Sequence, residues 1–264
     1  MSFLSVNNIS VSYGNNKITD NVSFEINKGN LVGILGANGS GKTTLLKAIC
    51  GILPHKGECI LDAVRLENLS DRALSKIISY IPQRSGISID ISALDVVLMG
   101  FNPQLGLLEH PSQDMKNQAS LMLEKVGLSG KENFNYMNLS EGQKQLCILA
   151  RTFVSDSKLL LLDEPESALD FQYRHSMLSL LKAWIASDYH CAVVALHDPL
   201  LALNMCDKLV LISEGRVIDI IEPMKDSLEK TEKKLALLYG DVSLHKCSDR
   251  KGNSRLVMLK EDEA

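Results

Sequence analysis

The sequence lacks several features that mark particular classes of protein. Its apolar runs are short, the longest stretch of leucines being Leu159–Leu162, and none approaches the ~20 residues that a membrane-spanning helix needs. The first residues, Met1–Ser5, show neither a basic segment nor a small-residue cleavage site, so we expect no signal peptide. The sequence therefore predicts a soluble chain, which would act at a membrane only through a partner.

Cysteine and histidine are also scarce. The six cysteines are scattered and contain no CxxC pair, which favours reduced thiols in a cytosolic protein over a disulfide framework or a zinc site. Most of the six histidines show no ligand spacing, and we expect these at the surface: His55, His110, His175, His190 and His245.

An excess of basic charge is absent. The chain carries 28 Lys and Arg against 32 Asp and Glu, a net charge of −4, so it has no basic footprint for nucleic acid or acidic lipid. Hydrophobic residues make up 45% and charged residues 23%, which excludes a disordered chain. The 264 residues can form one large domain or two small ones, and we expect no nucleic-acid partner.

Short apolar runs recur along the chain, and four of them end in polar residues. They lead into a glycine-rich loop, a glutamine, an acidic pair and a histidine. Continuous apolar strands separated by helical stretches indicate a mainly parallel sheet covered on both faces. Because ligands of such sheets bind outside the carboxyl ends of the strands, we expect these polar groups to form a single site. The four runs span residues 31–35, 77–81, 159–162 and 191–196.

Other regions have different patterns. The first thirty residues show short alternating segments, typical of an antiparallel β subdomain. Residues 88–153 keep helical spacing and predict a helical subdomain inserted between strands. Residues 209–218 predict a hairpin that turns at Glu214 and Gly215. The tail, from about residue 226, predicts an amphipathic helix followed by a second hairpin.

A phosphate-binding loop lies between the first apolar run and a helix. Residues 36–44, GANGSGKTT, fit the pattern GxxxxGK[ST] in the context that it requires. Glycines let successive N–H groups point at phosphate oxygens, and the helix N-terminus adds its positive dipole end. The Lys42 ammonium would reach the β- and γ-phosphates, and the Thr43 hydroxyl would bind Mg²⁺. The predicted nucleotide-binding residues are Gly36, Asn38, Gly39, Ser40, Gly41, Lys42, Thr43 and Thr44.

A second motif narrows the protein class, since a phosphate loop alone leaves kinases, GTPases and motor ATPases open. Residues 139–143, LSEGQ, precede a helix with apolar positions at helical spacing. Ser140 would cap this helix, which makes a second anion-binding helix N-terminus.

The chain resembles the ATP-binding cassette (ABC) ATPases over about residues 1–222, because LSEGQ is similar to their LSGGQ signature and the family's other motifs follow in order. The resemblance implies an α/β P-loop NTPase core with a mainly parallel sheet, the N-terminal antiparallel β subdomain and the helical subdomain at about 88–153. Residues 223–264 would form a C-terminal extension of helix and hairpin. The remaining matching motifs are Tyr13, Gln83, Leu159–Glu164, Ser167–Asp170 and His197.

The resemblance implies catalytic roles within one copy of the chain. Glu164 would be the general base that polarises the attacking water, and His197 would contact the γ-phosphate of ATP. Asp163 would hold Mg²⁺ together with Thr43, and Gln83 would contact the metal and the water. Tyr13 would stack on adenine.

Other roles act across a dimer. Ser140, Gly142 and Gln143 belong to the signature, which would clamp the γ-phosphate of ATP bound to a second copy. Asp170 would cross the same interface. The resemblance thus implies a head-to-tail homodimer with two ATP molecules at its interface. Splitting the phosphate-binding groups between two copies makes hydrolysis conditional on closure.

Two residues depart from the family pattern. Glu141 replaces the usual third-position glycine of the signature and brings a carboxylate near a polyanion, which could slow closure by repulsion. We favour a side chain that points away and leaves the contacts of Ser140 and Gly142 intact. Glu166 replaces the commoner threonine before Ser167, without an evident consequence from sequence alone.

The cargo follows from a narrower resemblance. Residues 96–100 and 103–106, with the tail helix around Leu238–Gly240, resemble the ATPases of iron–siderophore, haem and cobalamin importers. This implies a peripheral subunit on the cytoplasmic side of the cell membrane, paired with an integral membrane permease that docks near Gln83 and residues 86–106. An extracytoplasmic substrate-binding protein would take part indirectly. Iron–siderophore is the favoured cargo.

Three alternatives stay open. The same machine could carry haem, cobalamin, molybdate or zinc. An exporter subunit is disfavoured because no membrane domain is fused to the cassette. A soluble ABC ATPase of DNA repair or translation usually has a coiled-coil insert or two fused cassettes, and this chain shows neither.

Overall fold

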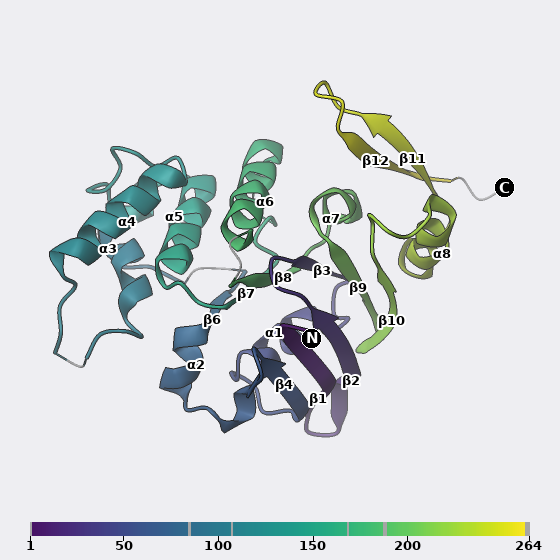
Figure 1. The fold of residues 1–264 in the computed structure, drawn as a ribbon, viewed down its shortest axis with the longest axis horizontal. Coiled ribbons are helices and arrows are strands. Elements are labelled where there is room, and N and C mark those ends of the chain that lie inside the picture. The colour runs from purple at the N-terminus through teal and green to yellow at the C-terminus, as the bar shows by residue number, and fades with distance from the viewer. Residues whose placement is uncertain (1, 84–85, 107, 168, 187–188, 262–264) are drawn as a thin grey trace.

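The computed structural model describes residues 2–83, 86–106, 108–167, 169–186 and 189–261. A four-stranded and a six-stranded sheet pack on opposite sides of helix α1 (Lys42–Ile49), and further helices cover the other face of the larger sheet (Figure 1). A group of helices forms one end of the molecule, and a two-stranded hairpin lies at the other end.

The larger sheet has the strand order β10-β9-β3-β8-β7-β6. Its strands pair in parallel except for β10, which pairs antiparallel with β9. The hairpin predicted at Glu214 and Gly215 is therefore confirmed, with both residues at positive φ. The strands are β3 (Leu31–Leu35), β6 (Ile78–Ile81), β7 (Leu159–Asp163), β8 (Cys191–Ala195), β9 (Lys208–Ser213) and β10 (Arg216–Ile221).

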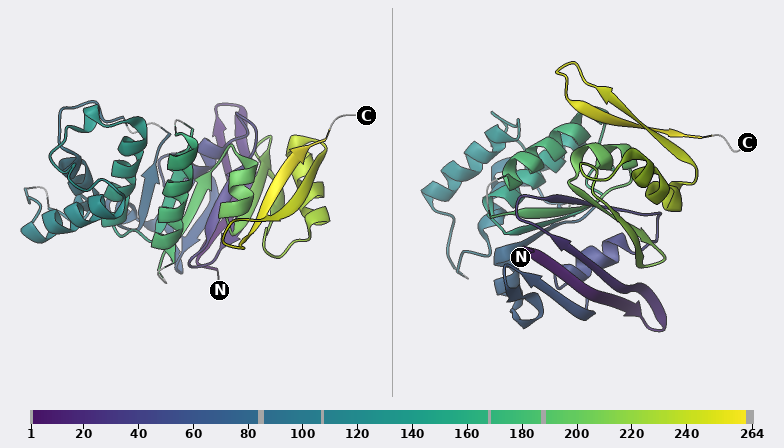
Figure 2. Two further views of the ribbon diagram at one scale, coloured as in Figure 1. Left: turned by 90° about the horizontal axis from the view of Figure 1, so that it is seen from above. Right: turned by 45° about the vertical axis from the view of Figure 1, so that its right-hand side comes forward.

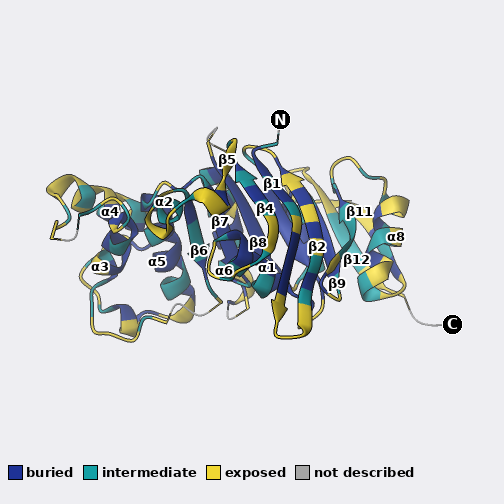
Figure 3. Ribbon diagram, turned by 90° about the horizontal axis from the view of Figure 1, so that it is seen from below, coloured by how far each residue is buried: buried dark blue, intermediate teal, exposed yellow. Residues whose placement is uncertain are grey.

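Helices or a second sheet cover both faces of this sheet, which explains its continuous apolar strands. Every residue of β3, β7 and β8 is buried (Figure 3). Because successive side chains point to opposite faces, Leu159 and Leu161 belong to the core cluster around α1, whereas Leu160 and Leu162 belong to the cluster on the other face.

The smaller sheet is antiparallel, with the order β2-β1-β4-β5. Its apolar side packs over α1, and alternate residues are buried from Val22 to Ile26 in β2 and from Leu4 to Val6 in β1, as the alternating sequence predicts. The strands are β1 (Leu4–Tyr13), β2 (Asn16–Ile26), β4 (Lys56–Leu61) and β5 (Val64–Arg65).

The helices expected between residues 88 and 153 are present, beside β6 (Figure 1). Each of the three α-helices begins after a serine whose hydroxyl oxygen accepts a backbone N–H bond, an arrangement that satisfies an otherwise unpaired donor. These helices are α3 (Ala93–Leu98), α4 (Gln113–Lys125) and α5 (Glu141–Val154), with short 3₁₀ turns η2 (Met99–Phe101) and η3 (Tyr136–Asn138).

The C-terminal part contains helix α8 (Leu228–Tyr239) and the hairpin of β11 (Val242–Ser248) and β12 (Ser254–Lys260), as the sequence predicts. The hairpin lies against α7 (Figure 2), where the Asn204 side chain donates to the Leu256 carbonyl and accepts from the Leu256 N–H, both at 2.9 Å. The remaining helices are η1 (Leu66–Asn68), α2 (Asp71–Ile77), α6 (Phe171–Ile185) and α7 (Pro199–Met205). Within the described ranges, no helix combines the length and the apolar character needed to cross a membrane.

Two of the histidines expected at the surface have largely covered side chains. His190 is buried, with its ring centroid 3.8 Å from that of Trp184. The His55 side chain is only 8% exposed and faces Glu67. The fold brings Trp184 against the His190 ring and Glu67 against the His55 ring, which is why the expectation was wrong for these two histidines. His110 and His245 are exposed as expected.

Candidate active site

The carboxyl ends of β3, β6, β7 and β8 meet around one pocket, as expected for parallel strands. The register aligns these ends, since Asp163 lies opposite Ala195 and Ile81 lies opposite Leu162. The pocket has a volume of about 540 Å³. Its lining residues are Tyr13, Ile18, Asn38, Gly39, Gly41, Lys42, Thr43, Thr44, Gln83, Glu164 and His197.

The glycines of the phosphate loop are required by close packing and by backbone conformation. A Cβ atom on Gly36 would lie 2.3 Å from the carbonyl oxygen of Ile212. Gly41 has a φ of +103°, a conformation that side chains disfavour, immediately before α1 begins at Lys42. The Lys42 ammonium donates to the Gly36 and Ala37 carbonyl oxygens at 2.8 and 3.2 Å. The loop therefore curls over its own lysine.

The loop offers buried polar groups that a phosphate can use. The Lys42 side chain is 4% exposed, and its ammonium lies 3.5 Å from Oε1 of Glu164. The Ser40 hydroxyl is buried and has no hydrogen-bond partner among the described residues. A buried cation and an unpaired hydroxyl beside a helix N-terminus fit an anionic ligand. Asn38 and Thr44, at either side of the loop, line the same pocket.

The oxygen atoms suited to a magnesium ion lie beside the loop. The Thr43 hydroxyl donates to Oδ1 of Asp163 at 2.9 Å, and the Tyr80 hydroxyl donates to Oδ2 at 3.1 Å. Burial raises the pKa of the Asp163 carboxyl, while the hydrogen bonds from Thr43 and Tyr80 act in the opposite direction. Hydroxyl, carboxylate and amide oxygens are the ligands that Mg²⁺ prefers, so Thr43, Asp163 and Gln83 fit this ion.

Sequence reasoning missed Tyr80. In the parallel pairing of β6 with β7, Tyr80 lies opposite Leu161, and Leu161 is two positions before Asp163. The only sequence signal is its place three residues before Gln83, and the contact depends on a register that the sequence alone does not specify.

Glu164 is the centre of the polar cluster in the pocket. Its φ of +49° is unusual for a residue other than glycine and turns the side chain into the site directly after β7. Oε2 of Glu164 accepts from the Gln83 amide at 2.9 Å and lies 2.6 Å from Nε2 of His197. With Lys42 on its other oxygen, the carboxylate is 13% exposed and held by three partners. Such a group can orient and deprotonate a water molecule.

Glu166 anchors the backbone of His197. The backbone N–H of His197 donates to Oε1 of Glu166 at 2.9 Å. The Glu166 side chain is buried, its Oε2 atom has no partner within the described part of the chain, and burial raises the pKa of its carboxyl. Glu166, which stands where the family more commonly has threonine, therefore anchors the loop that carries His197.

The signature motif forms the beginning of α5. Ser140 and Gln143 make a reciprocal capping box, in which the Ser140 hydroxyl accepts from the Gln143 N–H at 3.3 Å and the Gln143 side chain accepts from the Ser140 N–H at 3.2 Å. The Glu141 side chain is 65% exposed and pairs with Lys144 at 2.8 Å. Its carboxylate is thus directed along the helix surface, as we favoured.

Gly142 and Asp170 both contact Tyr173, Gly142 through the aromatic ring and Asp170 through the backbone N–H. A Cβ atom on Gly142 would lie 2.8 Å from the ring of Tyr173, so a glycine is needed there. Asp170 caps α6 by accepting the Tyr173 N–H at 3.0 Å. Tyr173 therefore connects the signature to the segment 167–170, of which Ala168 lies outside the described residues.

The signature is separate from the pocket in this single chain. None of Ser140, Gly142 and Gln143 is among the described residues that line the 540 Å³ pocket. The structure thus presents two separate groups of candidate site residues, one around Lys42 and Glu164 and the other at the N-terminus of α5.

Comparison with known proteins agrees with this arrangement. The family model for ABC transporters matches residues 19–167. The chain is 34% identical over 216 residues to a probable iron chelatin transport ATP-binding protein of Helicobacter pylori. The matched region covers 81% of this chain and 85% of that protein. It is 32% identical over 220 residues to the hemin import ATP-binding protein HmuV of Vibrio anguillarum, covering 81% and 83%.

A solved structure described as an inward-facing metal-chelate type ABC transporter is similar along almost the whole chain, with a TM-score of 0.82, 26% identity and 99% coverage of both chains. The fold implied by the motifs, an α/β P-loop cassette with an antiparallel β subdomain and a helical subdomain, is thus confirmed. The chain belongs to the ABC transporter family and is an ATP-binding, ATP-hydrolysing transporter subunit.

Proposed function

We propose that this subunit drives the uptake of a metal chelate, with iron–siderophore as the favoured cargo, through a separate membrane permease. The observation that carries the proposal is the similarity to one chain of a metal-chelate type transporter, because it covers 99% of this chain and so includes the extension beyond residue 222. The iron chelatin and hemin relatives support the same cargo class, with haem as the second candidate. We place residues 1–222 in the ATP-binding domain, and the subunit on the cytoplasmic face of the membrane.

The pocket geometry supports the following assignment of roles. Lys42 and the N–H groups of the phosphate loop bind the β- and γ-phosphates, and Tyr13, which is half exposed at the pocket edge, stacks on adenine. Thr43, Asp163 and Gln83 hold Mg²⁺, which when bound neutralises charge that develops on the phosphates. The other phosphate-loop residues assigned to the nucleotide are Gly36, Asn38, Gly39, Ser40, Gly41 and Thr44.

Glu164 takes the proton of the attacking water in this scheme. Without nucleotide its carboxylate is occupied by Lys42, Gln83 and His197. The phosphates of ATP would attract the Lys42 ammonium, which frees one carboxylate oxygen for water. His197, anchored through its backbone by Glu166, then contacts the γ-phosphate.

A second copy of the chain would complete the site. The capped N-terminus of α5 offers N–H groups and the Ser140 hydroxyl, yet this end lies outside the described lining of its own pocket. Placed against the γ-phosphate of ATP in another copy, Ser140, Gly142 and Gln143 would make closure a condition of hydrolysis. Asp170 would cross the same interface, next to Tyr173.

Replacing Glu164 tests the assignment of the base. We expect Glu164→Gln to keep ATP binding and to reduce hydrolysis by about 10²- to 10⁴-fold, because the amide cannot accept the proton of water. Phosphate release and nucleotide binding are measured in parallel. The control is Glu124→Gln, on the exposed surface of α4, which should hydrolyse ATP as the unmodified chain does. Undiminished hydrolysis in Glu164→Gln would remove Glu164 from this role.

Replacing Tyr80 tests the Mg²⁺ ligand. Tyr80→Phe removes a donor that lowers the pKa of the Asp163 carboxyl, so that pKa should rise. The acid side of the pH profile of hydrolysis should therefore move to higher pH, and half-maximal activity should need several-fold more Mg²⁺. Tyr189→Phe, at a site where the side chain is exposed, should change neither quantity. Identical pH and Mg²⁺ profiles for all three proteins would refute the assignment.

The transport proposal is tested with the tagged chain, isolated from its native membranes in mild detergent. We expect a multi-helix permease to co-purify, and the reconstituted complex to hydrolyse ATP faster with a loaded substrate-binding protein. Comparing iron–siderophore, haem and cobalamin as the load then identifies the cargo. Recovery of the chain in the soluble fraction with nucleic acid or ribosomes would contradict the proposal and favour an ABC ATPase that is not linked to transport.

A further inference from the structure

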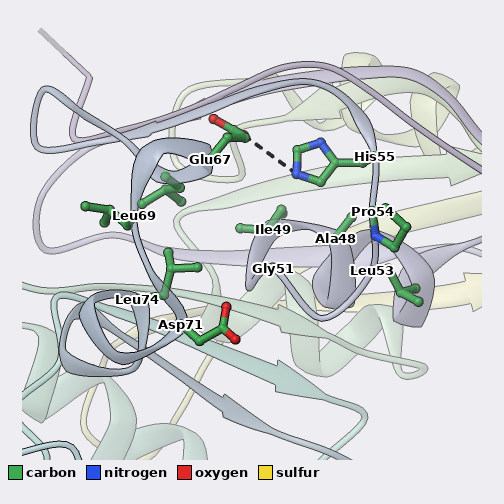
Figure 4. A pocket seen from close by; sticks show the side chains of 11 residues that line it. Ala48, Ile49, Gly51, Leu53, Pro54, His55, Glu67, Leu69, Asp71 and Leu74 are labelled. Atoms are coloured by element: carbon green, nitrogen blue, oxygen red, sulfur yellow. Dashed lines mark ion pairs between the residues drawn. The ribbon is translucent and has the colours of Figure 1, made fainter.

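Three potential metal ligands lie close together beside a second pocket, which two of them line, away from the ATP-binding loop. His55 lies in the loop before β4, Cys59 lies in β4, and Glu67 lies in η1. Their ligand atoms (an imidazole nitrogen, the thiol sulfur and a carboxylate oxygen) all lie within 4.8 Å of one another. Figure 4 shows the His55 ring and the Glu67 carboxylate facing each other across this pocket.

The hydrogen-bonding contacts of His55 leave one of its ring nitrogens available to a metal ion. Nδ1 lies 3.3 Å from the carbonyl oxygen of Lys56, a contact that favours the proton on Nδ1. The lone pair of Nε2 is then free, and this atom lies 3.6 Å from Oε1 of Glu67, too far for a hydrogen bond. A metal-bound histidine characteristically donates its other ring N–H to a backbone carbonyl or carboxylate in this way.

The Glu67 carboxylate is oriented by its own partners. Oε1 accepts the backbone N–H of Cys59 at 2.7 Å, and Oε2 accepts from Nε of Arg65 at 3.3 Å. Arg65 also pairs with Glu58 at 3.5 Å. These contacts hold the carboxylate beside the buried thiol while leaving lone pairs on its oxygens, which is the kind of outer support that metal ligands have.

The donor set and the space suit a transition metal. Nitrogen, sulfur and oxygen together favour Zn²⁺-like ions, whereas Mg²⁺ and Ca²⁺ prefer oxygen alone. Bonds of about 2.0–2.3 Å require ligand atoms roughly 3.3–3.8 Å apart, so the side chains need to close by about 1 Å. The adjoining pocket of about 310 Å³, lined by His55 and Glu67, leaves room for water or another ligand at the fourth position.

We propose that His55, Cys59 and Glu67 bind one divalent transition-metal ion such as Zn²⁺, with the fourth position open to the pocket. When the ion binds, the Cys59 thiol loses its proton to solvent, and a bond from sulfur to the metal replaces its covalent S–H bond. The thiolate and the carboxylate then balance the two charges of the ion. The bound ion joins the loop after α1 to β4 and η1. This proposal is independent of the transport function.

Cobalt(II) titration of the nucleotide-free, metal-depleted full chain tests the site. Thiolate bound to Co²⁺ gives an intense near-ultraviolet charge-transfer band, and a four-coordinate ion gives strong visible bands. We expect both, saturating at one Co²⁺ per chain and abolished by Zn²⁺. Cys59→Ser should remove the near-ultraviolet band, and His55→Gln and Glu67→Gln should weaken Co²⁺ binding at least tenfold. The ATP site contributes no thiol and cannot produce this band.

The matched control is the exposed pair His245 and Cys247, a second histidine and cysteine that lie close together in the sequence. His245→Gln with Cys247→Ser should leave the Co²⁺ spectrum unchanged. Thermal unfolding shows whether each variant is folded. Zn²⁺ should raise the melting temperature of the unmodified chain but not that of His55→Gln, which lacks one of the proposed ligands. A titration without the near-ultraviolet band, a band that survives Cys59→Ser, or a band lost in the control would overturn the proposal.

Discussion

The parallel pairing of β3, β8, β7 and β6 is the constraint on which the active site depends. It brings the ends of these strands, which are far apart in the sequence, to one edge of the sheet. Lys42, Glu164 and His197 follow the ends of buried strands by seven, one and two residues, so their positions are set by the packing of the core. A slip of one residue in a strand would turn its side chains to the opposite face and separate these groups.

Charge in this pocket is balanced within the chain itself. The buried Lys42 ammonium would be costly without an anion, and Glu164 supplies one at 3.5 Å. The same carboxylate also lies against Gln83 and His197. The proposed base, Glu164, is therefore held in place before ATP binds. When ATP binds, Lys42 would move from the Glu164 carboxylate to the phosphates, so nucleotide binding would release the carboxylate.

Local features and the meeting of the strand ends could be predicted from the sequence, whereas individual contacts between distant side chains could not. The phosphate loop, the Ser140 cap and the turn at Gly215 depend on neighbouring residues, so their residue types indicate them. The contact of Tyr80 with Asp163 depends on strand register, and the bond from His197 to Glu166 joins residues 31 positions apart. The burial of His55 likewise depends on η1, which folds back over its loop.

The central claim is that each chain holds half of an ATP site and that a second copy supplies the signature. Co-expression of Lys42→Ala with Ser140→Arg tests it directly, because neither variant alone should hydrolyse ATP. Mixed dimers contain one site with both an intact phosphate loop and an intact signature. The account predicts that equal amounts of the two variants recover about a quarter of the unmodified activity if closed sites work independently. A mixture as inactive as its components, or an active Ser140→Arg variant alone, would contradict it.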